Sequence, residues 1–134
     1  MKNIRNEFVP YELALKMKQL GFDEPCLARY NVPGDLITSG CYSDSSIMHL
    51  IVEENDICEA HILAPLYQQA FRWFREKYKF NHSIICHKHP FGTDDYQYLI
   101  LLDEDEFVET GFNTYEEAEL ACLEKLIEIV EQSK

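Results

Sequence analysis

Residues 81–103, "NHSIICHKHPFGTDDYQYLILLD", carry the clearest strand pattern in this chain. Two runs rich in β-branched, apolar and aromatic residues, at 81–88 and 96–103, flank the segment "HPFGTDD" at 89–95. A Pro and a Gly between two such runs are typical of a tight reversal. We therefore expect two strands that pair as an antiparallel hairpin.

Helical patterns lie before and after this hairpin. The segment "VPYELALKMKQLGF" at 9–22 has Pro10 in its first turn and Gly21 at its end, which are common helix start and stop signals. The segment "APLYQQAFRWFREKYKF" at 64–80 repeats aromatic residues at intervals of four, three and four, and this spacing predicts a helix with a core-facing aromatic stripe. Trp73 lies off that stripe, so an interaction patch and a core position are both open for it.

The C-terminal segment "TYEEAELACLEKLIEIVEQ" at 114–132 predicts a third helix. Thr114 followed three residues later by Glu117 forms a capping box. Apolar residues recur on one face of the helix, and the opposite face is mostly glutamate. We expect the apolar face to pack on a sheet.

The remaining segments predict shorter strands. "CLARYNVPGD" at 26–35 reads as a short strand before a turn, and "SIMHLIVEEN" at 46–55 as another strand, with a polar loop between them. "DEDEFVETGFN" at 103–113 reads as a charged turn and a short extended piece. The order helix, strand, strand, helix, strand, strand, helix predicts one acidic α+β domain over 1–134, an antiparallel sheet of about four strands with three helices packed on it.

Composition indicates a globular protein that lacks a membrane segment. The 134 residues are 46% hydrophobic with 13% aromatic residues, and no stretch approaches the roughly 18 apolar residues that cross a bilayer. The N-terminal sequence lacks a secretory signal, so we expect a cytoplasmic location. Five widely spaced cysteines indicate reduced thiols, for which burial is the first expectation. They are Cys26, Cys41, Cys58, Cys86 and Cys122.

Negative charge is concentrated in the C-terminal part of the chain. The formal net charge is −12, and residues 94–131 contain thirteen acidic side chains against the single Lys125. Such a surface repels phosphate backbones, so direct binding of nucleic acid is disfavoured. A basic protein partner fits this charge better, and a surface that only keeps the chain soluble is the simpler alternative.

The segment "CHKH" at 86–89 is the candidate for metal chemistry. Side chains alternate along a strand, so His87 and His89 should share a face, and two imidazoles on one face can bind zinc, copper or nickel. Two ligands do not make a site. A third would have to come from His49, Cys58, His61 or an acidic residue such as Asp94.

The sequence evidence for a catalytic site is weaker than the evidence for this metal site. Cys86 lies in an apolar strand run, where a thiol is commonly inert, and no glycine-rich phosphate loop or serine elbow occurs. Consecutive carboxylates in a turn diverge, which argues against a magnesium site at 103–106. We therefore expect a protein that is not an enzyme, with no catalytic residue, metal or cofactor. The candidate partner-binding surface is Asp103, Glu104, Asp105, Glu106 and Glu109.

Three segments together resemble an uncharacterised family of small bacterial proteins associated with phages and other mobile elements. They are "FVPYELALKMKQLGFDEPC", "APLYQQAFRWFREKY" and "TYEEAELACLEKLIEIV". The resemblance implies a genomic setting and a shared fold, and it brings no catalytic or binding residues. We expect an accessory protein that binds a basic protein partner through its acidic surface, and a homodimer through an apolar helical surface is also possible.

Overall fold

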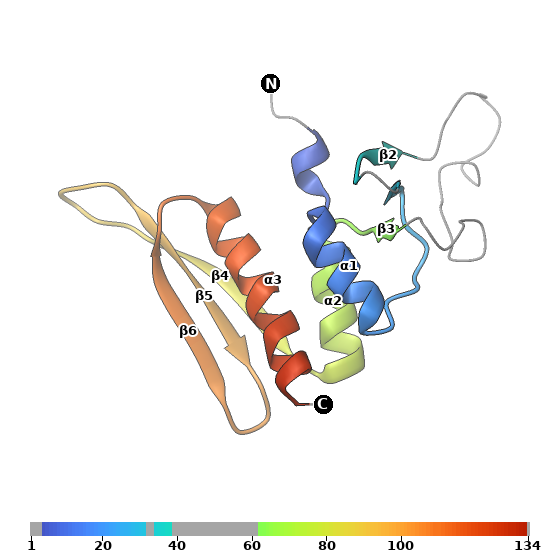
Figure 1. Ribbon diagram of the computed structural model, residues 1–134. Coiled ribbons are helices and arrows are strands. Elements are labelled where there is room, and N and C mark those ends of the chain that lie inside the picture. Colours follow the sequence, from blue (N-terminus) through green and yellow to red (C-terminus); the bar gives the residue numbers. More distant parts are fainter. Residues whose placement is uncertain (1–3, 32–33, 39–61, 134) are drawn as a thin grey trace. The chain divides into compact units, whose positions relative to one another are not determined.

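The computed structural model describes residues 4–31, 34–38 and 62–133 and has an α+β fold (Figure 1). Backbone contacts divide the chain into two compact units, Met1–Ala70 and Phe71–Lys134. Over the described residues there are three α-helices and two three-stranded antiparallel sheets. The α+β class and the antiparallel pairing predicted from the sequence are confirmed, whereas the strands form two sheets instead of one sheet of about four.

The first unit contains a short helix-and-sheet arrangement. Its elements are η1 (Ile4–Glu7), α1 (Tyr11–Gln19), β1 (Ala28–Tyr30), β2 (Leu36–Thr38) and β3 (Ile62–Ala64). Helix α2 (Tyr67–Tyr78) begins in the last residues of this unit. The strand order is β2-β1-β3, with both pairs antiparallel. The predicted strand at 46–55 and its preceding loop lie outside the described residues.

Helix α1 begins and ends where the sequence predicts. Pro10 occupies the cap position with extended backbone, and Gly21 follows the helix with φ of 101°, a conformation that glycine adopts without strain. The Tyr30 hydroxyl donates a hydrogen bond of 2.6 Å to the Val9 carbonyl, just before the helix. This buried bond connects β1 to the start of α1.

The second unit is a three-stranded meander covered by a helix. Helix α2 (Tyr67–Tyr78) leads into β4 (Asn81–His87), β5 (Asp95–Leu101) and β6 (Glu106–Phe112), and α3 (Tyr115–Gln132) follows. The strand order is β4-β5-β6, and α3 packs against all three strands, most extensively against β5. The predicted hairpin is confirmed, with strand boundaries within two residues of those expected.

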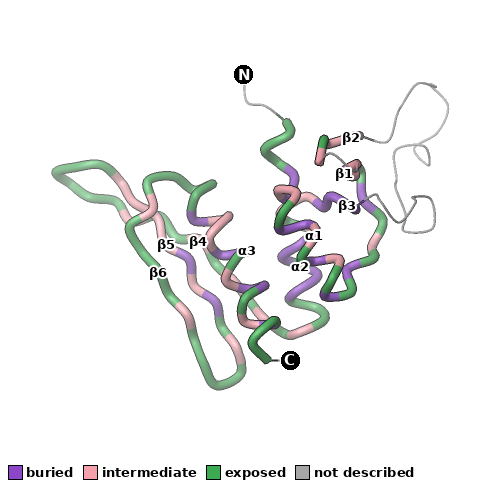
Figure 2. Tube along the Cα trace, in the orientation of Figure 1, coloured by how far each residue is buried: buried purple, intermediate pink, exposed green. Residues whose placement is uncertain are grey.

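One face of this sheet forms a core with α3. Burial alternates along β5 (Figure 2). Tyr98 and Ile100 are buried on the face that α3 covers, and Leu99 lies on the other face of the sheet. The predicted cap is present, because the Thr114 hydroxyl accepts a hydrogen bond of 3.1 Å from the Glu117 amide. The buried residues of α3 are Ala118, Cys122, Leu123, Leu126, Ile127 and Val130.

Two sequence expectations need refinement. Residues 106–112 form a full edge strand where a short extended piece was expected, because pairing with β5 supplies partners that local propensity does not reveal. Trp73 is 5% exposed and lies edge-on to Phe74 and Tyr78, so it is a core residue.

Within the described part of the chain, no helix is both long enough and apolar enough to cross a membrane.

Candidate functional site

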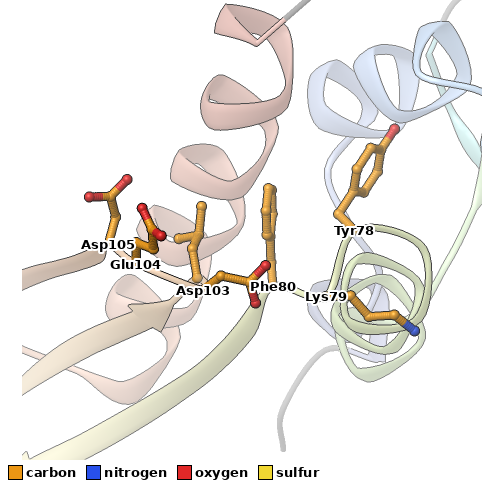
Figure 3. Close-up of a pocket in the computed structure, with 7 residues that line it drawn as sticks. Tyr78, Lys79, Phe80, Asp103, Glu104 and Asp105 are labelled. Atoms are coloured by element: carbon orange, nitrogen blue, oxygen red, sulfur yellow. The ribbon is translucent and has the colours of Figure 1, made fainter.

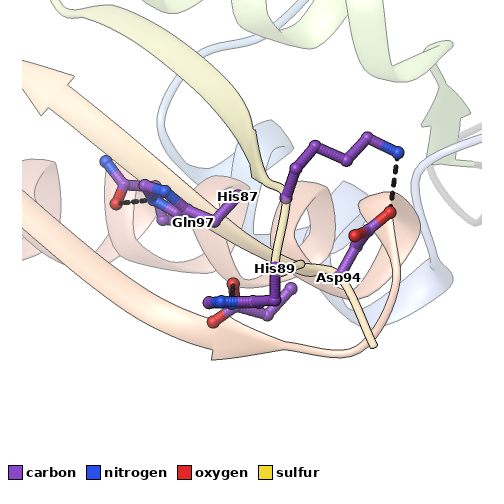
Figure 4. A network of polar contacts seen from close by, with 6 residues as sticks. His87, His89, Asp94 and Gln97 are labelled. Atoms are coloured by element: carbon purple, nitrogen blue, oxygen red, sulfur yellow. Dashed lines mark hydrogen bonds and ion pairs between the residues drawn. The ribbon is translucent and has the colours of Figure 1, made fainter. Parts of the chain in front are cut away.

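The "CHKH" segment lies at the end of β4, where the hairpin turns toward β5. His87 Nε2 donates a hydrogen bond to Gln97 Oε1 at 2.5 Å, and His89 Nε2 donates to Asp95 Oδ1 at 2.9 Å (Figure 4). The two imidazoles thus have separate partners on the facing strand. Both interactions hold the hairpin in register, which is a structural role.

Lys88 and Asp94 form an ion pair across the same turn, with Nζ and Oδ2 at 2.6 Å. The hydrogen bond from Lys88 lowers the pKa of Asp94, and the same contact raises the pKa of Lys88. Because both side chains are solvent-exposed, such a pair contributes little to stability. Its effect here is to occupy Asp94, one of the acidic residues considered as a third metal ligand.

The described residues therefore do not assemble a metal centre at His87 and His89. Over residues 4–31, 34–38 and 62–133, no three His, Cys, Asp or Glu side chains converge as metal ligands. His49, Cys58 and His61, the other possible third ligands, lie outside the described residues. The metal alternative stays a prediction.

The cysteines divide into buried and exposed thiols. Cys26 and Cys122 are buried, and burial raises the pKa of each thiol to about 12, so both are poor nucleophiles. The expectation that Cys86 is buried is wrong, because its thiol is exposed. Cys86 lies opposite Tyr96 on the edge strand β4, and α3 covers β4 less than it covers β5. A hydrogen bond with Cys86 is the main cause that raises the pKa of Tyr96.

The β5–β6 turn carries three adjacent carboxylates around a shallow cavity. The turn is closed by a hydrogen bond of 2.9 Å from the Leu102 amide to the Asp105 carbonyl. A cavity of about 370 Å³ lies beside it. Its lining residues are Tyr78, Lys79, Phe80, Leu102, Asp103, Glu104 and Asp105 (Figure 3).

Aromatic rings form the other wall of this cavity. The rings of Tyr78 and Phe80 have centroids 5.6 Å apart and planes 27° apart. In Figure 3, Phe80 stands beside Asp103, and the Lys79 side chain extends away from the carboxylates. Carboxylates next to aromatic faces provide both ion pairing and cation–π attraction, so the cavity suits a cationic side chain.

The predicted acidic surface is only partly continuous. Asp103, Glu104 and Asp105 lie together at the cavity, and Glu106 opens β6 on the face away from α3. Glu109 lies on the opposite face, opposite Tyr98, and its carboxylate accepts a hydrogen bond of 3.1 Å from the Tyr98 hydroxyl. Four of the five residues thus cluster near the turn, and Glu109 has a structural contact.

Helix α3 adds negative charge to the same end of the second unit. The helix runs back along β6, so its C-terminus and the β5–β6 turn lie at one end of the sheet (Figure 1). Glu128 and Glu131 are exposed there, and the last turn of α3 contains no basic residue. The negative end of the helix dipole adds to this charge. Lys125 Nζ lies 5.0 Å from the centre of the Phe107 ring and 3.5 Å from Glu128 Oε1. Its positive charge offsets part of the negative charge at this end.

Sequence reasoning found the carboxylates of this cavity and missed its aromatic wall. The aromatic spacing predicts Tyr78 on the core stripe of α2 and carries no prediction for Phe80. The available signal was the aromatic pair flanking Lys79 at the end of the helical pattern.

Comparison with protein-family models, curated proteins and solved structures finds no match to this chain.

Proposed function

We propose that this protein is a non-enzymatic, cytoplasmic accessory protein that binds a basic protein partner through its acidic surface at the β5–β6 turn. We define this acidic turn as residues 103–106. The observation that carries the proposal is the cavity that Asp103, Glu104 and Asp105 line together with Tyr78 and Phe80, with Phe80 beside Asp103.

The chemistry of the cavity favours a lysine or arginine side chain of the partner. Within the described part of the chain, no basic side chain forms an ion pair with Asp103, Glu104 or Asp105. Their negative charge is therefore available to a partner. Guanidinium and ammonium groups interact with carboxylates and also lie favourably on aromatic rings.

A mobile-element setting, which the sequence resemblance implies, favours a host nucleic-acid-binding protein as the partner. Such a protein presents a basic groove, and closely spaced carboxylates occupy it in place of phosphates. The adjacent carboxylates of the acidic turn, supplemented by Glu128 and Glu131 on α3, support this version of the proposal.

Affinity capture from bacterial lysate tests the proposal. The tagged full chain is compared with the variant Asp103→Asn/Glu104→Gln/Asp105→Asn at low and moderate salt. The matched control is Glu7→Gln/Glu12→Gln/Asp23→Asn, which removes three exposed carboxylates from the first unit. We expect a basic partner that is retained by the wild type and the control, lost from the acidic-turn variant, and released by salt.

Two results would contradict the proposal. One is a partner whose retention does not depend on ionic strength or on the three carboxylates. The other is the absence of any basic protein in the captured material, which would leave solubility as the role of the acidic surface.

A further inference from the structure

The face of the β4–β5–β6 sheet that points away from α3 carries a group of exposed apolar side chains. The register pairs Leu99 with Val108 and places Leu101 two residues along on the same face, with Ile85 on the neighbouring strand. Exposed fractions are 36% for Ile85, 43% for Leu101 and 50% for Val108, and Leu99 is half-buried. We call this set of four residues the open apolar face.

Such a face is unusual on a chain with this much charge. Single exposed apolar residues are ordinary, whereas neighbouring ones on adjacent strands mark interaction surfaces. On the other side of the same sheet, the equivalent positions Tyr98 and Ile100 are 4% and 0% exposed because α3 covers them. The two faces therefore differ in whether a helix lies on them.

A carboxylate next to the acidic turn borders the open apolar face at one end. Glu106 lies on the same face opposite Leu101, whereas Asp95 at the far end of the hairpin is paired with His89 at 2.9 Å. A second copy of this chain that brought the two acidic ends together would place charges of the same sign side by side. A partner with lysine or arginine beside an apolar stripe would instead complement both the apolar centre and the acidic end.

The dimensions of the sheet favour a helix as that partner element. Three strands spaced about 4.8 Å apart span roughly 10 Å, which matches the diameter of one α-helix. A single helix, α3, already covers the opposite face of these strands. An amphipathic helix buries its apolar stripe on a sheet and leaves its charged residues at the margins.

We propose that the open apolar face binds one basic amphipathic helix of a protein partner. This inference rests on the proposed function, because it assigns the secondary structure and the apolar contacts of the basic partner. The apolar side chains provide the contact area, and Glu106 with the acidic turn at one end selects a helix that carries positive charge beside its apolar stripe.

Fluorescence anisotropy with designed peptides tests the inference on the full chain. The probe is a labelled peptide of roughly 18 residues with Leu at helical spacing and Lys elsewhere, and its control has the same composition in shuffled order. The face variant is Leu101→Thr/Val108→Thr, which places a β-branched residue with high strand propensity at both positions. The matched control variant is Ile4→Thr/Leu27→Thr, which changes two exposed apolar residues of the first unit.

We expect the striped peptide to bind the wild type, and the shuffled peptide to bind at least about tenfold more weakly. The face variant should lose about tenfold in affinity for the striped peptide, and the control variant should bind like the wild type. The comparison of the two peptides uses unchanged protein, so it does not depend on how well a variant folds.

The acidic-turn variant is measured with the same peptides, so that failure of this inference can be told from failure of the proposed function. Equal binding by the face variant and the wild type, or no saturable binding by the wild type, would overturn the inference. Loss only in Asp103→Asn/Glu104→Gln/Asp105→Asn leaves the proposed function standing without the open apolar face, whereas loss only in the face variant counts against the proposed function. A wild-type dimer that the face variant converts to monomer, seen by light scattering, would show that a second copy occupies the face and would overturn the inference.

Discussion

His82, the second residue of β4, lies flat against the ring of Phe71, with centroids 3.8 Å apart and planes 15° apart. Burial, with a smaller effect from the positive charge of Arg75, lowers the pKa of His82 to about 4. The imidazole is therefore neutral in the folded protein at pH values where an unfolded chain has begun to protonate it. Sequence reasoning concentrated on His87 and His89, because the contact between His82 and Phe71 exists only after α2 and β4 have packed.

This lowered pKa makes stability depend on pH. Between about 6.5 and about 4 the unfolded chain binds a proton at His82 that the folded chain does not, so stability is lost as the pH falls through that interval. We expect His82→Phe to reduce this loss by on the order of 2 kcal/mol, after allowance for partial solvent access. Urea unfolding at the two ends of the interval, followed by Trp73 fluorescence, measures it.

The variant Ser83→Ala is the control, since Ser83 is exposed on the same strand and carries no group that titrates in this interval. It should retain the wild-type loss of stability between the two pH values. The same loss in His82→Phe as in the wild type would show that His82 does not carry this pH dependence.

At the scale of elements, α2 is followed by a residue in an unfavourable backbone conformation. Lys79 has φ of 63°, in the left-handed region where helices usually place glycine. Its amide donates to the Arg75 carbonyl at 3.1 Å, and the Phe80 amide donates to the Phe74 carbonyl at 3.4 Å. These bonds close the helix and turn Phe80 toward the cavity.

Glycine at this position should therefore stabilise the protein. We expect Lys79→Gly to raise the free energy of unfolding by roughly 0.5–1 kcal/mol, because glycine reaches positive φ without the clash of a Cβ. Glu76→Gly, at an exposed position inside the same helix, should lower it by about 1 kcal/mol. Thermal unfolding of both variants measures the two changes. A decrease in both would show that the left-handed conformation costs less than the added freedom of the unfolded chain.

Local signals predicted the helices and the β4–β5 hairpin well. Caps and periodic apolar residues depend on neighbours in sequence, so Thr114 with Glu117 and the alternation through Tyr98 and Ile100 were informative without a structure. The edge strand β6 was expected only as a short extended piece, because its residues include Glu106, Glu109 and Gly111. It pairs with β5 in a hairpin, but its residues lack the regular apolar alternation that marks β5.

The sequence likewise predicted only the part of the candidate site that is formed by neighbouring residues. The three carboxylates are consecutive, so any turn would keep them close, and the sequence predicted them as a surface. Their meeting with Tyr78 and Phe80 depends on how the end of α2 lies beside the β5–β6 turn. The separation of the strands into two sheets is likewise set by pairing between distant segments.

At the scale of the whole molecule, charge is distributed in a way that opposes folding. The acidic turn lies at the same end of the second unit as the C-terminus of α3, where Glu128 and Glu131 meet the negative end of the helix dipole. Like charges held close together destabilise the compact state. A surface kept for solubility alone has no need for this concentration of charge at one end.

We therefore expect Asp103→Asn/Glu104→Gln/Asp105→Asn to be more stable than the wild type by roughly 1 kcal/mol at low salt. The difference should disappear near 1 M salt, where charges are screened within about 3 Å. Urea unfolding across a salt series measures it, with Glu7→Gln/Glu12→Gln/Asp23→Asn as the control that changes less. A variant less stable than the wild type at low salt would mean that these carboxylates support the fold. A gain in stability together with a loss of the captured partner would fit carboxylates maintained for binding at the expense of stability, as at many functional sites.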